Sequence, residues 1–287
     1  AMYIADGWKD YEVLDTGDGE KLERWGSVIL SRPDPQAIWP KQSPSEWAKA
    51  HAVYHRSSRG GGEWEFFKKL PERWEIGYRD LKFYVHPTNF KHTGLFPEQA
   101  ANWDFAMDAI RHAGRPIRVL NLFAYTGGAT VACASAGAEV THVDSAKAMV
   151  ERAGENVRLS GLTDAKVRYI IDDCLKFVRR EIKRGRKYDA IIMDPPSFGR
   201  GPGGEMWKIE DNLFSLIRET KEVLSDNPLF YLLNSYTTGL QPTVMANMLK
   251  LGLNTSKNAV ITADEIGLNT REEGIVLPAG ASALAIF

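Results

Sequence analysis

The sequence contains only two cysteines, Cys133 and Cys174, among its 287 residues. Two thiols are too few for a disulfide scaffold or for a zinc site of four thiolates. The six histidines form no HExxH motif, so the sequence indicates no metal site. A signal peptide and a long apolar run are also missing. Together these absences predict a cytoplasmic protein with no metal ion and no membrane contact.

Charge of one sign is not in excess either. The chain has 36 basic and 37 acidic residues and a net charge of −1. A protein that binds polyanions over its whole surface is more basic, so any contact with nucleic acid requires a local patch. Apolar residues make up 44% and charged residues 25% of the chain. This composition is typical of a folded globular protein and excludes disorder as the main state.

The residue pattern changes near Arg115 and Pro116, which predicts two domains, 1–115 and 116–287. The first contains all of the tryptophans except Trp207, and Gly and Pro separate its short β-like runs. Because a few large aromatic side chains can fill a small core, we expect a β-rich N-terminal appendage. A partner surface is the alternative role for these tryptophans. The most basic stretch of this domain contains Arg56, Arg59, Lys68, Lys69 and Arg73.

In the second domain, short apolar runs alternate with amphipathic stretches. This alternation predicts a doubly wound, Rossmann-like α/β fold with a mostly parallel, seven-stranded sheet. No helix separates the last two runs, so we expect them to form an antiparallel hairpin. The expected strands are 117–122, 139–143, 167–171, 189–193, 229–234, 257–262 and 281–287. The expected helices are 128–136, 146–160, 174–184, 209–225 and 242–251.

Ligands of such sheets bind beyond the carboxyl ends of the strands, where four segments of this chain should meet. The first is Phe123-Ala124-Tyr125-Thr126-Gly127-Gly128. Its glycines allow close approach of a ligand to the backbone, and it opens a helix with free amides. A tight turn without a ligand is the alternative. Neither GxGxxG nor GxxxxGK[ST] occurs here, so the loop is not that of a dinucleotide or P-loop site.

Carboxylates follow the second and third strands. Asp144 could accept hydrogen bonds from the two hydroxyls of a ribose, or Ser145 beside it could cap the next helix. One carboxylate of Asp172-Asp173, before Cys174, could accept from the amino group of an adenine. Helix capping is again the alternative.

The fourth segment, Asp194-Pro195-Pro196-Ser197-Phe198, follows a buried strand. The two prolines fix an extended turn and have no N–H, which should leave outward carbonyls beside the Asp194 carboxylate. Such a group of acceptors suits a planar substrate nitrogen that carries hydrogens, and Phe198 offers a face for stacking. A simple loop stop is the alternative.

These segments resemble the class I S-adenosylmethionine-dependent methyltransferases. More narrowly, they resemble the bacterial family that contains the 23S ribosomal RNA large-subunit methyltransferases, which make 5-methylcytosine or 7-methylguanine. The resemblance covers roughly residues 80–287, and its most specific parts are Lys91–Gln99 and Asn121–Gly128. It implies S-adenosylmethionine as the cofactor, methyl transfer as the reaction and ribosomal RNA as the partner.

The resemblance also implies a role for each matching residue. Asp144 and Ser145 would hold the ribose, and Asp172, Asp173 and Cys174 would border the adenine. Asp194, Pro195, Pro196 and Phe198 would be catalytic, with Asp194 facing both the cofactor and the substrate. The residues around the methionine moiety would be Thr93, Gly94, Leu95, Phe96, Gln99, Phe123, Ala124, Tyr125, Thr126 and Gly127.

One departure from the family affects the expected product. Relatives that methylate cytosine C5 first add a cysteine thiolate to the base, and this cysteine follows the fifth strand. Here that segment, 233–237, reads LNSYT. Cys133 should be packed in an Ala-rich helix, and Cys174 should lie on the cofactor side. We therefore expect transfer to a nitrogen, with an oxygen as second choice, of a base-like acceptor and not to cytosine C5.

Several alternatives stay open. The acceptor could be a protein or a small molecule, or the chain could bind a nucleotide cofactor without catalysis. A nicotinamide dehydrogenase would share Asp144 but needs GxGxxG. Lys91 and His92, and the basic run 179–187, either contact RNA phosphates or are solvated. Tyr236 either positions a substrate or is structural. Whether the chain forms a homodimer is also open.

Overall fold

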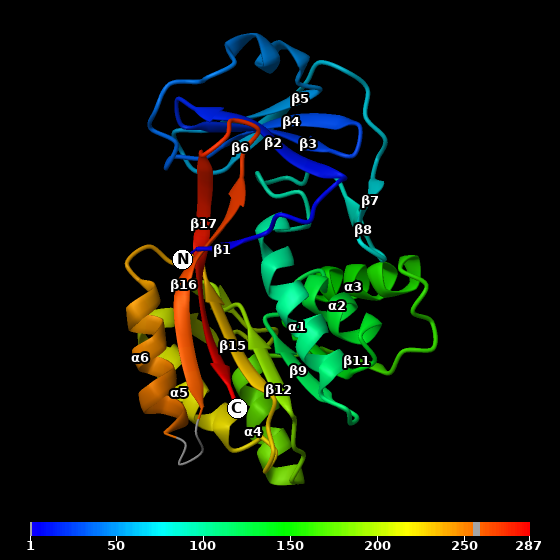
Figure 1. Cartoon of the computed structure of the whole chain (residues 1–287), viewed down its shortest axis with the longest axis vertical. Coiled ribbons are helices and arrows are strands. Elements are labelled where there is room, and N and C mark those ends of the chain that lie inside the picture. Colours follow the sequence, from blue (N-terminus) through cyan, green and yellow to red (C-terminus); the bar gives the residue numbers. More distant parts are fainter. Residues whose placement is uncertain (1, 255–258) are drawn as a thin grey trace. The chain divides into compact units, whose positions relative to one another are not determined.

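The computed structural model describes residues 2–254 and 259–287. The chain forms two compact units (Figure 1). Unit 1 comprises Asn102–Ile266 and Ala279–Phe287 together with the first residues of the chain, and unit 2 comprises Ile4–Ala101 and Gly267–Pro278. Unit 1 therefore begins before residue 116, because Ala106 and Ile110 share a hydrophobic core with the first parallel strand.

A mixed sheet of eight strands forms the centre of unit 1, in the order β1-β16-β17-β15-β12-β9-β10-β11. The pairs β10–β11, β9–β10, β9–β12 and β12–β15 are parallel, and β17 is antiparallel to β15. The strands are β1 (Tyr3–Ile4), β9 (Arg118–Leu122), β10 (Glu139–Asp144), β11 (Val167–Ile171), β12 (Ala190–Met193), β15 (Phe230–Ser235), β16 (Val260–Asn269) and β17 (Val276–Ile286).

The predicted fold class is thereby confirmed, but several elements differ from the prediction. The helix Ala100–His112 was not predicted, β16 continues to Asn269 where an end at 262 was expected, and β17 begins at Val276 where a start at 281 was expected. The sheet has eight strands where seven were expected, because the two-residue strand β1 adds to its edge. Strand β16 begins at Val260, and residues 257 and 258 of the predicted strand lie outside the described residues. The last two strands are neighbours, and Figure 1 shows them running in opposite directions, as expected of a hairpin.

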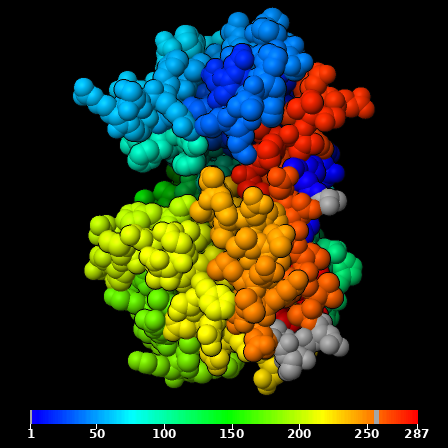
Figure 2. Space-filling model, turned by 90° about the vertical axis from the view of Figure 1, so that its left-hand side faces the viewer, coloured from blue at the N-terminus to red at the C-terminus, as the bar shows by residue number. Residues whose placement is uncertain are grey.

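Helices cover both faces of this sheet because its central strands are apolar on both sides. Strands β12 and β15 are buried along their whole length. Figure 2 shows α5 in yellow and α6 in orange on one side of unit 1. The helices are α1 (Ala100–His112), α2 (Gly128–Ser135), α3 (Lys147–Leu159), α4 (Cys174–Arg184), α5 (Ile209–Lys221) and α6 (Pro242–Leu253).

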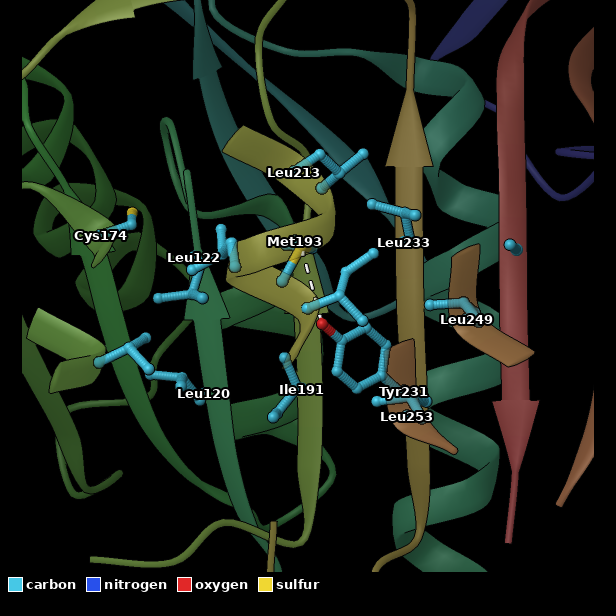
Figure 3. Close-up of a cluster of buried hydrophobic side chains, with 14 of the residues drawn as sticks. Leu120, Leu122, Cys174, Ile191, Met193, Leu213, Tyr231, Leu233, Leu249 and Leu253 are labelled. Atoms are coloured by element: carbon cyan, nitrogen blue, oxygen red, sulfur yellow. Dashed lines mark hydrogen bonds between the residues drawn. The ribbon is translucent and has the colours of Figure 1, made fainter. Parts of the chain in front are cut away.

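Two hydrophobic clusters hold these layers together. On one face, Leu122, Met193 and Leu233 from three neighbouring strands pack with Leu213 of α5 and Leu249 of α6 (Figure 3). The opposite face packs against α1 and α2. Burial of apolar side chains of this size contributes about 1.5–3 kcal/mol each. The clusters make the sheet a rigid support for the loops at its edge.

Unit 2 is built from β-sheets, as predicted for the N-terminal appendage. A five-stranded sheet has the order β2-β3-β4-β5-β6, and β7 and β8 form a separate pair. Its strands are β2 (Tyr11–Gly17), β3 (Glu20–Trp25), β4 (Val28–Pro33), β5 (Ala52–Arg56), β6 (Gly62–Phe66), β7 (Trp74–Tyr78) and β8 (Leu81–Val85). Two 3-10 helices, Pro44–Lys49 and Pro97–Gln99, complete it.

Most tryptophans of unit 2 brace its loops through the indole N–H. Trp8 donates to the Pro97 carbonyl, and Trp47 donates to the Asp15 carboxylate. Trp64 donates to the carbonyls of Thr88 and Phe90. Each indole thus combines apolar area with a satisfied polar group. This supports the structural reading of the tryptophans.

Candidate active site

The candidate site lies where the order of the parallel strands reverses. From β9 the chain continues to β10 and β11 on one side, while β12 and β15 lie on the other. Ligands of open parallel sheets bind at such a switch point, beyond the carboxyl ends of the strands. Backbone hydrogen bonds join the four predicted segments there: Ala124 N–H donates to Val143, Asp172 N–H to Asp144, and Asp194 N–H to Leu122.

The loop after β9 has an unusual backbone. Phe123 and Tyr125 have φ of 54° and 52°, and Gly127 has φ of 85°. Left-handed conformations are costly for side chains with a Cβ, and they concentrate at functional sites. The buried amide of Asn156 in α3 donates to the Thr126 carbonyl at 2.9 Å and holds this loop. The fold therefore maintains a strained turn at the switch point.

Asp144 is bound to that loop. Its Oδ2 accepts from the Tyr125 N–H at 2.9 Å, and its Oδ1 accepts from the Ala146 N–H at 2.9 Å. Burial raises the pKa of Asp144, and the backbone N–H groups of Ala146, Tyr125 and Ser145 oppose this shift. The alternative role of Ser145 as a helix cap is not realised, since α3 has Ala146 at its N-cap and no side-chain cap bond. The Asp144 carboxylate accepts from the N–H of that N-cap residue.

The segment after β11 serves the start of α4. The Asp173 carboxylate caps this helix by accepting from the Lys176 N–H at 3.0 Å. Asp172 accepts from Arg180 of the same helix at 2.5 Å. The capping alternative is thus realised for Asp173. Cys174 turns its thiol into the core, where Sγ accepts from the Phe123 N–H at 3.4 Å.

Asp194 directly follows strand β12, beside the switch point. Its Oδ1 accepts from the side-chain amide of Asn234 at 3.1 Å. Asn234 lies in the neighbouring strand β15 and is 2% exposed. The buried amide therefore orients the carboxylate.

Only part of the expected group of outward carbonyls is present. The Pro196 carbonyl accepts from the Trp207 indole at 2.7 Å. Trp207 belongs to β14 (Met206–Lys208), which pairs with β13 (Phe198–Arg200). This carbonyl therefore has one partner within the chain already, and the catalytic role of Pro196 stays a prediction. Phe198 is 53% exposed, and its role in stacking stays a prediction.

The residues from Thr93 to Gln99 lie in unit 2. Thr93 is buried, and its hydroxyl has no hydrogen-bond partner among the described residues. Gly94 has φ of 93°, which glycine adopts readily. Leu95 is buried, and Phe96 precedes the 3-10 helix at Pro97–Gln99. Their contact with the methionine moiety stays a prediction.

Neither cysteine is placed as a nucleophile. Cys133 is fully buried in α2, and burial raises the pKa of its thiol to about 12. Burial also raises the pKa of Cys174. Thiols in such surroundings are inert. The ring of Tyr236 lies against Gly280: a Cβ added to this glycine would come within 2.8 Å of the ring. Tyr236 therefore has a structural contact.

Some residues of the site were not predicted. The Thr130 hydroxyl lies 2.7 Å from His142 Nδ1 and accepts from the Asn121 amide at 3.0 Å, all three being buried under the loop. Burial lowers the pKa of His142 to about 4, so its imidazole is neutral. Asn234 and Asn156 were also missed. Polar residues inside apolar runs were the available signal, because buried polar side chains need partners.

The comparisons with known proteins agree with this geometry. A model of a family described as S-adenosylmethionine-dependent methyltransferase matches residues 41–233. The chain belongs to this family. A crystal structure of a SAM-dependent methyltransferase from Agrobacterium tumefaciens has 35% identity and a TM-score of 0.93, over 98% of this chain and 91% of that one. The predicted resemblance, enzyme class and cofactor are confirmed.

Two curated relatives match parts of this sequence. Ribosomal RNA large subunit methyltransferase K/L of Shewanella frigidimarina is 33% identical over 148 residues, 51% of this chain. Ribosomal RNA large subunit methyltransferase I of Klebsiella pneumoniae is 43% identical over 82 residues, 28% of this chain. In each case the match spans only 20% of the relative.

The Asp144 carboxylate fits the ribose of S-adenosylmethionine. A carboxylate offers about four acceptor positions. Backbone N–H groups use part of this capacity, and the rest can accept from the hydroxyls of a ribose. Among the described residues, no group of three or more His, Cys, Asp or Glu could hold a metal ion. No helix in the same part of the chain is long and apolar enough to cross a membrane.

Proposed function

We propose that this methyltransferase methylates a base nitrogen in RNA, and that the RNA is ribosomal. The observation that carries the proposal is the acceptor-rich, thiol-free end of β12. Asp194 is held there by Asn234, and Pro195 and Pro196 contribute no N–H. This arrangement suits an amine acceptor. It does not suit cytosine C5, because both cysteines are buried with raised thiol pKa values.

Three of the predicted segments would hold the cofactor from unit 1. Asp144 would accept from the ribose hydroxyls, and the backbone of the loop from Phe123 to Gly127 would line the methionine moiety. Asp172 and Asp173 would border the adenine, together with the backbone of Cys174, since its thiol faces the core. S-adenosylmethionine supplies an electrophilic methyl group on a sulfonium when it is bound.

Asp194 would act on the acceptor. Positive charge develops on an amine nitrogen as it forms a new bond to carbon, and a fixed carboxylate stabilises that charge. The Pro195 carbonyl would accept a second hydrogen from the same nitrogen. Phe198 would stack on the base and hold the nitrogen in line, which is a gain in orientation.

A cluster of cations in unit 2 supports RNA as the acceptor. Lys21 and Arg32 are opposite each other on β3 and β4, and Arg32 donates to the Lys91 carbonyl at 3.1 Å. Burial lowers the pKa of Lys91, and Arg56, Lys21 and Arg32 lower it further, whereas Asp34 raises it. Phe90, next to Lys91, is 64% exposed. Arg32 pairs with Glu23 and Lys21 with Asp34, so Lys91 and Arg56 are the cations proposed to contact phosphates. Cations beside an exposed aromatic ring are typical of single-stranded nucleic-acid sites.

The basic run 179–187 contributes less to such a site. Arg179 pairs with Glu219, Arg180 with Asp172, and Arg184 with Glu181. The Lys187 ammonium donates to the Glu222 carbonyl at 2.7 Å. These contacts favour a structural role for the run. We therefore place the RNA contact at the cluster of cations around Lys91 in unit 2.

The direct test compares modified nucleosides of RNA from cells with and without the gene by mass spectrometry. We expect one N-methylated nucleoside to disappear without the gene and to return with the wild-type gene. It should not return with Asp194→Asn, whereas the exposed control Asp226→Asn should restore it. Loss of 5-methylcytosine, or unchanged RNA with methylation of a protein or a metabolite, would overturn the proposal.

A further inference from the structure

Three buried polar side chains form a chain of hydrogen bonds that ends on Asp194. Asn102 of α1 donates from Nδ2 to Ser282 Oγ at 3.1 Å. Ser282 of β17 donates to Asn234 Oδ1 at 2.8 Å, and Asn234 Nδ2 donates to Asp194 Oδ1 at 3.1 Å. Asn102, Ser282 and Asn234 are 7%, 0% and 2% exposed. Asn234 and Ser282 are directly opposite each other in the β15–β17 pairing.

The direction of this chain follows from Asp194. An ionised carboxylate can only accept, so Asn234 must present its N–H group to it. The Asn234 carbonyl oxygen then faces Ser282 and requires a donor. Ser282 has a single hydroxyl proton, and it is free to donate this proton only if its oxygen accepts from Asn102. Each member therefore determines the orientation of the next.

We infer that Asn102 and Ser282 are positioning residues, which set the orientation of the Asn234 amide and through it the Asp194 carboxylate. This inference rests on the proposed function of Asp194. Neither residue belongs to the sequence segments that carry the resemblance to the methyltransferase family. Their effect is transmitted through buried, water-excluded hydrogen bonds, where an unpaired group is costly.

Asn102→Asp tests the direction of the chain with almost no change of shape. An aspartate cannot donate to Ser282, so the serine proton turns toward it and Asn234 Oδ1 loses its donor. The Asn234 carbonyl oxygen is then buried without a donor, so the amide is no longer held in the orientation that presents its N–H group to the Asp194 carboxylate. Ser282→Ala interrupts the chain at its centre, and Ser282→Thr keeps the hydroxyl as the conservative control.

Methyl transfer to RNA from cells that lack the gene is measured with labelled S-adenosylmethionine, and the stoichiometry of cofactor binding counts the folded molecules. We expect kcat per folded molecule to fall by about 10-fold to 100-fold in Asn102→Asp and Ser282→Ala. The Kd for the cofactor should stay within about twofold, and Ser282→Thr should recover most of kcat. A merely structural role would reduce the folded fraction and leave kcat per folded molecule unchanged.

A second readout does not depend on activity. The side-chain amide signals of Asn234 in the cofactor-free protein, identified by their loss in Asn234→Ala, should shift in Ser282→Ala and stay in place in Ser282→Thr. Unchanged kcat and unchanged amide signals in folded Asn102→Asp and Ser282→Ala would overturn the inference. If Asp194→Asn is itself fully active, the proposed function of Asp194 fails instead, and the two failures are thereby distinguished.

Discussion

At the scale of single residues, Asp144 combines burial with a specific hydrogen-bonding task. Replacing it with asparagine removes the charge and one acceptor oxygen, while the shape stays nearly the same. Hydrogen bonds to charged groups contribute about 1.5–3 kcal/mol. We therefore expect Asp144→Asn to weaken the binding of S-adenosylmethionine by about 10-fold to 100-fold, measured by calorimetry. Asp164→Asn, at an exposed position, should bind the cofactor normally.

The same carboxyl predicts a pH dependence. Burial raises the pKa of Asp144 above its ordinary value of 3.8. The carboxyl therefore protonates at a higher pH than an exposed aspartate does, and the charged acceptor for the ribose is lost there. Cofactor affinity should fall as the pH is lowered through this raised pKa. Asp144→Asn should not show this decrease, and an identical decrease in that variant would contradict the assignment.

A buried ion pair in unit 2 carries a second prediction at this scale. Arg32 donates to both carboxylate oxygens of Glu23, at 2.6 and 2.7 Å, and Tyr11 donates to the same carboxylate. Removing one partner leaves an uncompensated buried charge, which costs about 3–5 kcal/mol. Arg32→Met should destabilise unit 2 by this amount in urea, and the double variant with Glu23→Gln should recover a large part of it.

Acid should weaken the same pair. Burial acts to raise the pKa of Glu23, but Arg32, Lys21 and the hydrogen bond from Tyr11 outweigh it, so the pKa is lowered from 4.5. A lowered carboxyl pKa contributes stability above the unfolded value of 4.5. This contribution is lost as the pH falls from 4.5 through the lowered pKa. The double variant should be less sensitive to pH in this range.

At the scale of elements, the junction of β9 and α2 depends on Gly127. A Cβ there would meet the Cβ of Ala153 at 2.9 Å, and the φ of 85° disfavours a side chain. Gly137, in the turn after α2, has φ of 98° but nothing within 4 Å of a Cβ. Gly137→Ala should therefore cost about 1 kcal/mol from the backbone alone, and Gly127→Ala clearly more.

The two glycine substitutions should also differ in their effect on cofactor affinity. Gly127→Ala should shift the loop that contacts Asp144 and so weaken the binding of S-adenosylmethionine, whereas Gly137→Ala should leave it unchanged. Thermal unfolding and calorimetry measure the two effects. Equal losses of affinity in both variants would show that the loop does not contact the cofactor.

The sequence was sufficient for elements whose signal is local. The alternation of apolar runs and amphipathic stretches predicted the parallel strands and the helices α2 to α6 within a few residues, because each pattern lies within one element, whereas α1 was missed. The four loops that meet at the switch point also followed, since parallel strands place their carboxyl ends on one edge. Asp144 and Asp194 were found in this way.

Contacts between distant segments could not be found from one sequence. The partner of Asn234 is 48 residues away, and that of Asn102 is 180 residues away, so both depend on strand register. The three-residue strands of the β13–β14 pair were too short to show a pattern, and therefore the bond from Trp207 to Pro196 was missed. Ser145 does not cap α3 because the helix begins one residue later, with Ala146 as its N-cap.

At the scale of the whole molecule, the salt dependence of RNA binding locates the contact. Each phosphate contact with a single strand adds about 0.7 to the slope of log K against log salt concentration. Arg56→Gln combined with Lys91→Gln should therefore reduce the slope by about 1.4. Lys183→Gln combined with Arg186→Gln removes the same charge from the basic run and should change the slope little. The opposite result would move the contact to that run.

The composition of unit 2 from two separate stretches has a consequence for biosynthesis. Arg271 pairs with Glu12 at 2.8 Å, and Val13 forms a β-bridge with Thr270. On the ribosome, the N-terminal stretch emerges long before the residues that make these contacts with it, although N-terminal domains usually fold first. Unit 2 therefore lacks these contacts while the helices and strands of unit 1 are made, and proteases should cleave it more readily in a nascent chain arrested at residue 250 than in the full chain.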